Sequence, residues 1–404
     1  MMKHPSPGLA APSSRMEALS LQYFATLAPM IGELHASGMD VIRLDIGSPD
    51  LPPPPQVIET LSRSATQESH HGYQHYRGTS QLREAWASFY LRKFGVELDP
   101  EREVVPLLGS KEGIFHLAQA LINPGDIALV PNPGYLTYES GTSFAGGKPY
   151  FLPLKAGSYL PNLKDVPGEI VGRARVLWLN YPNNPTGAVA ERDYFKDAVA
   201  FAREHNLLIC NDAAYTQITY DGFQAPSLLE IPGAKDVAVE FNTLSKSHNM
   251  AGWRTGVVVG NEHALDALYT LKTHADSGQF LPIMEAASAA LMIGEEWFVE
   301  QNDIYRRRRD LVVEQLSELG TQFQLPRGAI YLWFKVPSGW SSIDFTETLL
   351  KDKGVSLAPG TIFGTGGEGF ARLSLCRPED RLLDAMERIT DWWNQNANGG
   401  LRDA

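Results

Sequence analysis

The chain has 404 residues of ordinary globular composition, 43% hydrophobic and 20% charged, with a formal net charge of −12. This acidic balance argues against nucleic acid or an anionic membrane as the main partner, because both attract basic surfaces. No stretch reaches the roughly 18 apolar residues of a membrane-spanning helix, and the N-terminus lacks the apolar core of a signal peptide. Cys210 and Cys376 show neither metal-ligand nor disulfide spacing, so we expect a soluble cytoplasmic protein.

The N-terminal part is predicted to be an arm followed by one helix and a short strand. Residues 1–14 are rich in Pro, Ser and Gly. From 15 to about 36, apolar residues recur at helical spacing, with Pro29 as the expected kink. A short strand over 41–44 then leads into GSPDLPPPP, whose prolines predict an extended loop.

Short β-branched runs and amphipathic stretches alternate after Tyr73. This alternation predicts an α/β fold with a mainly parallel sheet that helices cover on both faces. The six predicted strands span 103–108, 127–130, 175–180, 207–211, 237–242 and 255–259. Predicted helices between them span 111–122, 134–144 and 191–204.

The C-terminal part changes character and predicts a smaller α+β domain. A long helix over about 295–320 precedes strands at 329–335 and 370–376, and a helix over 378–394 closes the chain. The four arginines at 306–309 are interpreted as a solvated basic stretch of the long helix. We expect a large domain over 51–280 and a small domain over 281–404, to which the arm and helix of 1–50 also belong.

Lys246 lies in the segment FNTLSKSHNMAGWRTG, just after a predicted strand. By itself it could be an ordinary loop lysine. A lysine that forms a Schiff base needs burial or nearby cations that help it release its proton. Thr243 and Ser245 supply hydroxyls suited to a phosphate, and Arg254 adds a cation eight residues later. This combination indicates a lysine that carries pyridoxal 5'-phosphate (PLP).

Asp212 stands at the end of a very apolar strand, where an unpaired carboxylate is costly. One interpretation is a cap on the turn that follows the strand. The other is the partner of the pyridinium nitrogen of PLP, whose positive charge makes the ring an electron sink. Tyr215, three residues later, is placed to hydrogen-bond the phenolic oxygen of the same ring.

Two further strand ends complete the candidate site. The segment NNPTG at 183–187 is a turn signal by itself, and its functional interpretation has the Asn184 amide donating to the same ring oxygen. Ser110 and Lys111 open a helix after Gly109, where backbone N–H groups and a hydroxyl bind phosphate. Tyr135 opens the next helix and is placed to stack on the ring. Ligands in open α/β sheets bind at the carboxyl ends of strands, where these residues lie.

Taken together, these segments resemble the fold-type I PLP-dependent aminotransferases of class I and II. The resemblance covers nearly the whole chain, from about Gly47 to Arg372, in the family's order. IGSPDLPPP, HYRG, GSKEGI and SKSHNMAGWR look most like the branch that contains LL-diaminopimelate and alanine aminotransferases. Thr243 and Thr255 depart from the usual residues without removing a functional group. The resemblance implies an aspartate aminotransferase-like fold, whose large domain has a seven-stranded type of sheet.

The resemblance also implies roles for residues outside the cofactor segments. Gly47 and Arg372 would hold the substrate α-carboxylate, with Arg372 as a bidentate fork. Arg254 would pair with the cofactor phosphate. Tyr73 would reach the phosphate in the neighbouring subunit of a homodimer with shared active sites.

The implied reaction is transamination between an L-amino acid and a 2-oxo acid, such as LL-diaminopimelate, alanine or aspartate with 2-oxoglutarate. Lys246 would act as general base and acid at the substrate Cα. A β-lyase or decarboxylase on the same fold remains the nearest alternative. A PLP-sensing regulator would carry an added DNA-binding domain, for which the short N-terminal arm leaves little room. A scaffold conflicts with the joint presence of Lys246, Asp212, Tyr215 and Arg254.

Two motifs are set aside. The glycines at 364, 366 and 369 match GxGxxG, but a strand is predicted after them instead of the helix that a dinucleotide site needs. His70, His71 and His75 lie in a polar loop without a matching set of Cys, Asp or Glu, so no metal site is expected. His248 is interpreted as part of the local structure.

Overall fold

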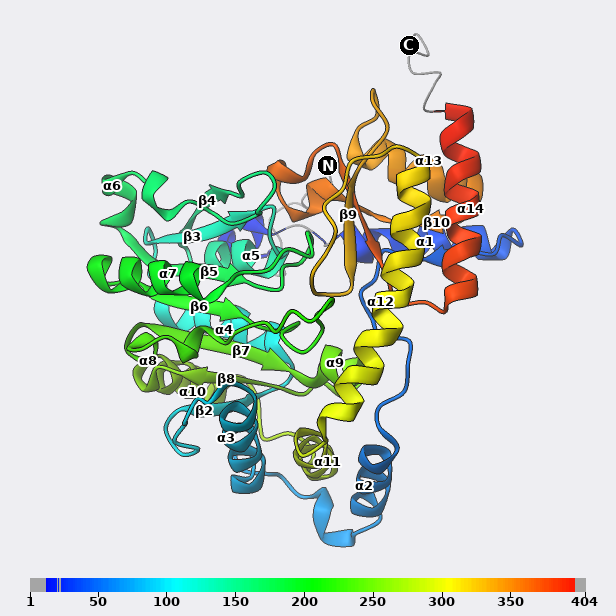
Figure 1. Ribbon diagram of the computed structural model, residues 1–404. Helices are drawn as coiled ribbons and strands as arrows, with labels where there is room; N and C mark the ends of the chain where they lie inside the picture. Colours follow the sequence, from blue (N-terminus) through cyan, green and yellow to red (C-terminus); the bar gives the residue numbers. More distant parts are fainter. Residues whose placement is uncertain (1–11, 20, 22, 397–404) are drawn as a thin grey trace.

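The computed structural model describes residues 12–19, 21 and 23–396. Within them, seven strands form one sheet in the order β2-β8-β7-β6-β5-β3-β4 (Figure 1). β8 is antiparallel to both of its neighbours and the other pairings are parallel, so the predicted, mainly parallel sheet is confirmed. The strands are β2 (Val104–Leu107), β3 (Ile127–Asn132), β4 (Lys148–Pro153), β5 (Ala174–Asn180), β6 (Leu208–Asp212), β7 (Ala238–Thr243) and β8 (Gly256–Gly260).

The edge strand β4 is the one that the sequence pattern missed. It pairs with β3 alone, and of its six residues only Leu152 is buried. Its three consecutive apolar residues at 150–152 are flanked by Pro149 and Pro153, which is a weaker strand signal than the runs that predict the other six strands.

Side chains of the sheet alternate between two helical layers. Val176 and Trp178 of β5 pack into the apolar cluster that α4, α5 and α10 share. Leu177 and Leu179 pack on the other face, against α3, α7 and α11. The helices of these two layers are α3 (Ser80–Phe94), α4 (Ser110–Leu121), α5 (Leu136–Phe144), α7 (Arg192–His205), α10 (Glu262–Ala275) and α11 (Leu281–Leu291). The other helices of this part of the chain are α2 (Pro55–Ala65), α6 (Gly168–Val171), α8 (Ala234–Val237) and α9 (Leu244–Ser247).

A second apolar core lies beside the sheet, around α12 (Glu295–Glu318) and α14 (Glu379–Asn396). It includes a three-stranded sheet of β11 (Ala358–Pro359), β12 (Phe370–Ser374) and β9 (Tyr331–Lys335), packed on α13 (Ser342–Lys353). The N-terminal strand β1 (Ile42–Arg43) pairs with β10 (Val355–Ser356), so the start of the chain joins its C-terminal part.

The single helix predicted over 15–36 is wrong. The structure has a 3-10 turn over Ser14–Ala18 and a separate helix, α1 (Tyr23–Ala36), which contains Pro29. The turn ends because Leu19 adopts an extended conformation, with φ −117° and ψ 133°. Apolar spacing alone does not reveal such a break.

The prediction that residues 306–309 are solvated is wrong for Arg308 and Arg309. Arg308 and Arg309 are only 4% and 3% exposed. Arg308 forks to Asp50, with nitrogen–oxygen distances of 2.7 and 2.9 Å, and Arg309 forks to Asp221 at 2.6 and 3.0 Å. Four consecutive residues point around the whole circumference of a helix, so two of these charges turn inward and each pairs with a carboxylate.

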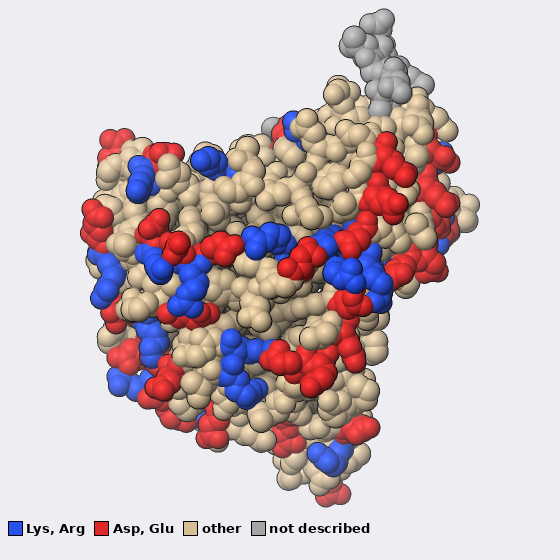
Figure 2. Space-filling view, in the orientation of Figure 1, with Lys and Arg blue, Asp and Glu red and all other residues tan. Residues whose placement is uncertain are grey.

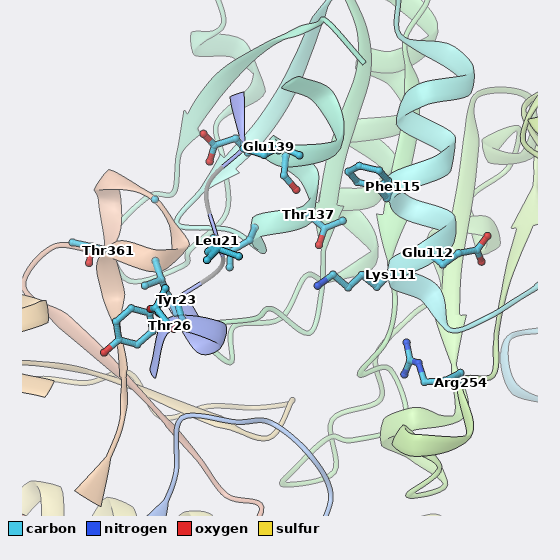
Figure 3. Close-up of a pocket in the computed structure, with 15 residues that line it drawn as sticks. Leu21, Tyr23, Thr26, Lys111, Glu112, Phe115, Thr137, Glu139, Arg254 and Thr361 are labelled. Carbon is cyan, nitrogen blue, oxygen red and sulfur yellow. The ribbon is translucent and has the colours of Figure 1, made fainter. Parts of the chain in front are cut away.

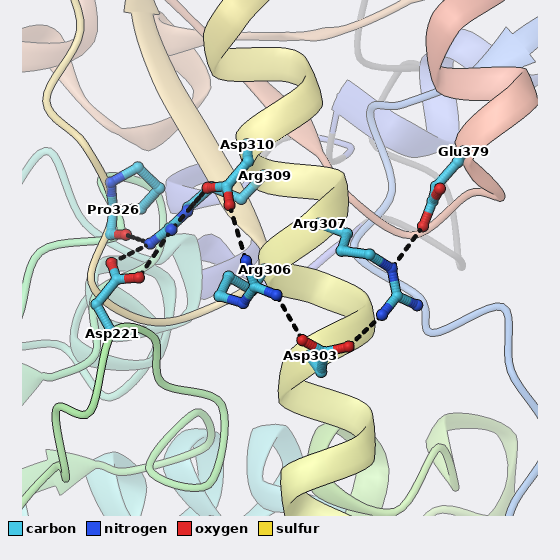
Figure 4. Close-up of polar contacts among 8 residues, drawn as sticks. All are labelled: Asp221, Asp303, Arg306, Arg307, Arg309, Asp310, Pro326 and Glu379. Carbon is cyan, nitrogen blue, oxygen red and sulfur yellow. Dashed lines mark hydrogen bonds and ion pairs between the residues drawn. The ribbon is translucent and has the colours of Figure 1, made fainter.

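Arg306 and Arg307 are the solvated half of this stretch. Both pair with Asp303 one turn earlier on α12, and Arg307 also reaches Glu379 of α14 (Figure 4). On the face shown in Figure 2, basic side chains stand beside acidic ones over much of the surface. None of the helices in the described part of the chain is long and apolar enough to cross a membrane.

Candidate active site

A cavity of about 380 Å³ lies where β2, β3, β5, β6 and β7 end. Twelve of the thirteen predicted site residues line it: Gly47, Ser110, Lys111, Tyr135, Asn184, Asp212, Tyr215, Thr243, Ser245, Lys246, Arg254 and Arg372. Segments far apart in the sequence therefore meet at one edge of the sheet, as the rule for α/β folds predicts. Tyr73 lies apart from this lining and is 95% exposed.

Asp212, the last residue of β6, is buried on the cavity wall. Its Oδ2 accepts a 2.8 Å hydrogen bond from the Tyr138 hydroxyl, and its Oδ1 accepts one from the Ala214 N–H at 3.3 Å. Burial raises the pKa of Asp212 to about 6, and the Tyr138 hydrogen bond opposes this rise. Tyr138 was missed from the sequence, although it lies one helical turn after Tyr135 on α5.

Lys246 stands on α9, a single helical turn that follows β7. Its Nζ donates a hydrogen bond to the carbonyl oxygen of Gly47. Thr243 caps this turn, because its hydroxyl oxygen accepts from the Ser245 N–H at 3.1 Å and donates to the Thr255 carbonyl at 2.8 Å. The Thr243 hydroxyl is therefore engaged in holding the lysine turn in place.

His248 packs just behind this turn, with its imidazole buried and its Nδ1 2.8 Å from the Ser247 hydroxyl. Burial lowers the pKa of His248 to about 3, which keeps the ring neutral. It does not line the cavity, so it belongs to the local packing.

The opposite wall of the cavity is positively charged. Ser110 begins the 12-residue helix α4, whose N-terminal N–H groups attract anions. The Arg254 guanidinium lies so close to Gly109 that a Cβ there would stand 2.4 Å from Nη2. Burial, and then the charge of Arg254, lower the pKa of Lys111. Figure 3 shows Lys111 and Arg254 on this side.

Arg372 reaches the cavity from β12, in the second core. It is 4% exposed, and its two terminal nitrogens donate to the Asn184 side-chain oxygen at 2.7 Å and the Asp45 carbonyl at 2.6 Å. Its guanidinium carbon lies 4.1 Å from the centre of the Tyr331 ring. The fork is thus fixed in one orientation by two acceptors and an aromatic ring.

Tyr331 is a second residue that sequence reasoning missed. Its hydroxyl lies 2.9 Å from that of Tyr215, and both side chains line the cavity. A Cβ on Gly47 would stand 1.9 Å from the Tyr331 hydroxyl oxygen, so this position has room for glycine alone. Phe24 of α1 also lines the cavity.

The two walls suit the two ends of PLP. Asp212 is a buried carboxylate whose hydrogen-bond partners are neutral, so a cationic ring nitrogen would compensate its charge. Ser110, at a helix N-terminus, and Arg254 provide N–H donors and positive charge for a phosphate. Lys246 lines the same cavity and carries the amine that PLP binds covalently.

One other cluster contains residue types that can bind a metal ion. Glu112, His116 and Asp276 bring three possible metal-ligand atoms within 4.8 Å of one another, the one such group among the described residues. The Lys272 ammonium lies 2.7 Å from Asp276 and 3.3 Å from Glu112. This ion pair already balances the carboxylates, so the cluster is an electrostatic link between α4 and α10.

Comparison with known proteins identifies the family. The family model for aminotransferase class I and II matches residues 39–389. LL-diaminopimelate aminotransferases from Desulforudis audaxviator and Natranaerobius thermophilus are 46% and 44% identical to this chain, over 93% and 94% of it and 96% and 99% of their own length.

Solved structures agree with this result. Substrate-bound BacF from Bacillus subtilis superposes with a TM-score of 0.92 at 37% identity, over 95% of this chain and 98% of its own. An aspartate aminotransferase from Thermotoga maritima gives 0.88 at 32% identity, over 95% of this chain and 100% of its own. The chain therefore belongs to the class I and II aminotransferases and is a PLP-dependent enzyme that transfers amino groups between amino acids and 2-oxo acids.

Proposed function

We propose that this aminotransferase uses LL-diaminopimelate as amino donor and 2-oxoglutarate as acceptor. The observation that carries the proposal is the 42–46% identity, over more than nine-tenths of the chain, to relatives that bear the name LL-diaminopimelate aminotransferase. Alanine and aspartate are the competing donors, since enzymes named for aspartate also share the fold.

The cofactor roles follow from the two walls of the cavity. Bound PLP supplies a ring that withdraws electrons from the substrate Cα. Asp212 would hold a proton on the ring nitrogen, and the hydrogen bond from Tyr138 fixes the orientation of the Asp212 carboxylate. Tyr215 and Asn184 would hydrogen-bond the phenolic oxygen of the ring, and Tyr135 would stack on its face.

The phosphate roles would belong to residues that follow β2 and β7 and to Arg254, which lies just before β8. The Ser110 N–H and hydroxyl, the Ser245 hydroxyl and the Arg254 guanidinium would bind the phosphate, and Lys111 would add positive charge. Thr243 contributes by capping the turn on which Lys246 stands.

The substrate roles belong to the other half of the site. Arg372 and the Gly47 backbone bind the α-carboxylate, and the contacts of Arg372 with Asn184 and Tyr331 fix the plane of its fork. With the cofactor bound, Lys246 would act as the base and acid for the proton at the substrate Cα. Its position beside the Gly47 carbonyl keeps its Nζ near the bound carboxylate end of the substrate.

We further propose that the enzyme is a cytoplasmic homodimer. The exposed side chain of Tyr73 supports this, because a tyrosine that serves the partner's phosphate must point away from its own subunit. Residues 51–280 would form the cofactor-binding domain, and 281–404 together with 1–50 the small domain. The pairing of β1 with β10 supports that division.

Borohydride reduction followed by peptide mapping tests the cofactor assignment. The reduced cofactor should be found on Lys246, and Lys246→Ala should bind PLP without becoming labelled or turning over. Labelling of a different lysine in the wild type would contradict the site.

Product analysis with a panel of amino donors tests the reaction. LL-diaminopimelate should be consumed only when a 2-oxo acid is added, and 2-oxoglutarate should be preferred to pyruvate. Steady product formation without an acceptor would instead identify a β-lyase or decarboxylase.

A further inference from the structure

A second cavity, of about 770 Å³, adjoins the active site. Both cavities are lined by Lys111 and Arg254, so the second extends the first (Figure 3). Its walls come from the N-terminal segment, α4, α5 and the loop that includes Thr361 and Gly364. A substrate held by its α-carboxylate at Arg372 therefore has space for a long side chain beyond the reacting carbon.

Much of this extension is apolar. Six aliphatic or aromatic side chains contribute to its walls: Leu19, Leu21, Tyr23, Phe115, Leu136 and Ile362. Such a surface favours a methylene chain over a short polar side chain, because burying apolar groups is favourable.

Glu139 and Glu112 are the acidic residues that line this cavity, and they differ in their partners among the described residues. Glu139 lies in the first turn of α5, just after Tyr135, which caps the helix and lines the cofactor cavity. No hydrogen bond or ion pair joins the Glu139 side chain to any residue that the structure describes, whereas Glu112 on the same wall pairs with His116 and Lys272. The Glu139 side chain is exposed at the rim of the cavity, and the desolvation that it does experience there raises its pKa.

We propose that Glu139 binds an ammonium group at the far end of the substrate side chain. The inference rests on the proposed function and deepens it, since LL-diaminopimelate carries a second ammonium and a second carboxylate beyond a methylene chain. A terminal carboxylate is attracted by the positive charge of Lys111, so it does not call for Glu139. The Glu139 carboxylate is what separates donors with a distal ammonium from donors such as L-glutamate, which have only a distal carboxylate.

The test compares these two donors in the PLP-loaded enzyme. Glu139→Gln keeps the shape of the side chain and removes its charge. It should lower kcat/KM for LL-diaminopimelate about 10- to 100-fold, mainly through KM, the range expected when a charged hydrogen-bond partner is lost. The value for L-glutamate should change less than about twofold. Glu169→Gln is the matched control, because Glu169 is exposed on α6, away from both cavities.

Equilibrium binding gives a readout that does not depend on turnover. In the inactive Lys246→Ala background, Glu139→Gln should weaken LL-diaminopimelate binding by a similar factor and leave L-glutamate binding unchanged. Equal losses for both donors, or no loss for either, would overturn the assignment of Glu139.

The two proposals fail in different ways. If the wild type uses LL-diaminopimelate well and Glu139→Gln does too, only the role of Glu139 is wrong. If the wild type transaminates other amino acids but not LL-diaminopimelate, the proposed donor is wrong. The role of Glu139 is then tested with L-lysine and L-ornithine, which carry a distal ammonium. If Glu139→Gln does not reduce activity with them, the proposed role of Glu139 is wrong as well.

Discussion

The Tyr138 hydroxyl donates a 2.8 Å hydrogen bond to Oδ2 of Asp212, and both side chains are buried at the end of β6. This hydrogen bond stabilises the charged carboxylate, yet burial outweighs it and raises the pKa of Asp212 to about 6. A cationic ring nitrogen would reverse that balance. The charged Asp212 carboxylate therefore destabilises the cofactor-free protein, and it becomes favourable when the cofactor's ring nitrogen pairs with it.

The first prediction concerns this cost in the cofactor-free protein. Because the folded pKa of Asp212 lies above its ordinary value of 3.8, the folded state binds the proton more tightly between about pH 4 and 6. The contribution of Asp212 to stability is therefore fully present below pH 4 and is lost as the pH rises through 6. The difference between the two pKa values is worth about 3 kcal/mol.

The Asp212→Asn variant has a side chain at this position that does not ionise, so it serves as the reference for the wild-type pH dependence. Urea unfolding of both cofactor-free proteins between pH 4.5 and 7 should show the Asn variant gaining about 2 kcal/mol relative to wild type. Parallel stability profiles would mean that Asp212 does not titrate as its burial implies.

In the loaded enzyme the Asp212→Asn substitution should lower kcat by several orders of magnitude, because the ring proton is no longer held.

The second prediction concerns the Tyr215–Tyr331 pair. Tyr331→Phe keeps the ring that lies against Arg372 and removes the hydroxyl that lies 2.9 Å from Tyr215. We expect KM for the amino donor to change little and kcat to fall about 5- to 10-fold, the value of one hydrogen bond. The pH dependence of the bound cofactor's absorbance should also shift, because the Tyr215 hydroxyl would lose a partner.

A double-mutant cycle separates this role from simple packing. If Tyr331 acts through Tyr215, adding Tyr331→Phe to Tyr215→Phe should cost little more than Tyr215→Phe alone. Independent, multiplying losses would show that Tyr331 has a separate function.

That site residues such as Asp212 and Lys246 follow strands, and so share one edge of the sheet, could be predicted from the sequence because such positions depend on local signals. A short apolar run ends, a turn or helix begins, and polar residues at that point lie at the same edge of the sheet. Asp212, Asn184, Ser110 and Lys246 all come together in this way.

Tyr331 could not be predicted in the same way, because its position depends on pairing between distant strands. It pairs with Ser374 across β9 and β12, and Ser374 lies two residues after Arg372, so Tyr331 and Arg372 are diagonal neighbours on one face. The inward turn of Arg308 likewise depends on Asp50, which is 258 positions away in the sequence. Such partners become visible only when the tertiary structure is known.

The third prediction uses the difference between the two halves of the arginine run. Arg308→Met removes the partner of Asp50 at a nearly buried ion pair and should lower the free energy of unfolding by about 3–5 kcal/mol. Arg307→Gln, on the exposed half of the same helix, should cost less than about 1 kcal/mol. Urea unfolding of both variants checks this difference in the free energy of unfolding. Equal losses would mean that burial does not strengthen the ion pair of Arg308 with Asp50.

The last prediction is that two subunits share each active site. Tyr73 is 95% exposed and does not line the cavity of its own chain. It could therefore contact a phosphate only in the active site of a partner subunit. In a C2 dimer, mixing Lys246→Ala with Tyr73→Phe then yields heterodimers in which one site carries both changes and the other carries neither. Each parent must first show a clear loss of activity by itself.

Activity after subunit exchange should therefore rise above the sum of the two parents. At full random exchange half of the dimers are mixed, and each has one intact site, so activity should approach about a quarter of that of an equal amount of wild type. Exchange is monitored with differently tagged subunits, so that a negative result is informative. If mixed dimers form and no activity returns, or if the active species is a monomer by sedimentation, Tyr73 does not complete a neighbouring site.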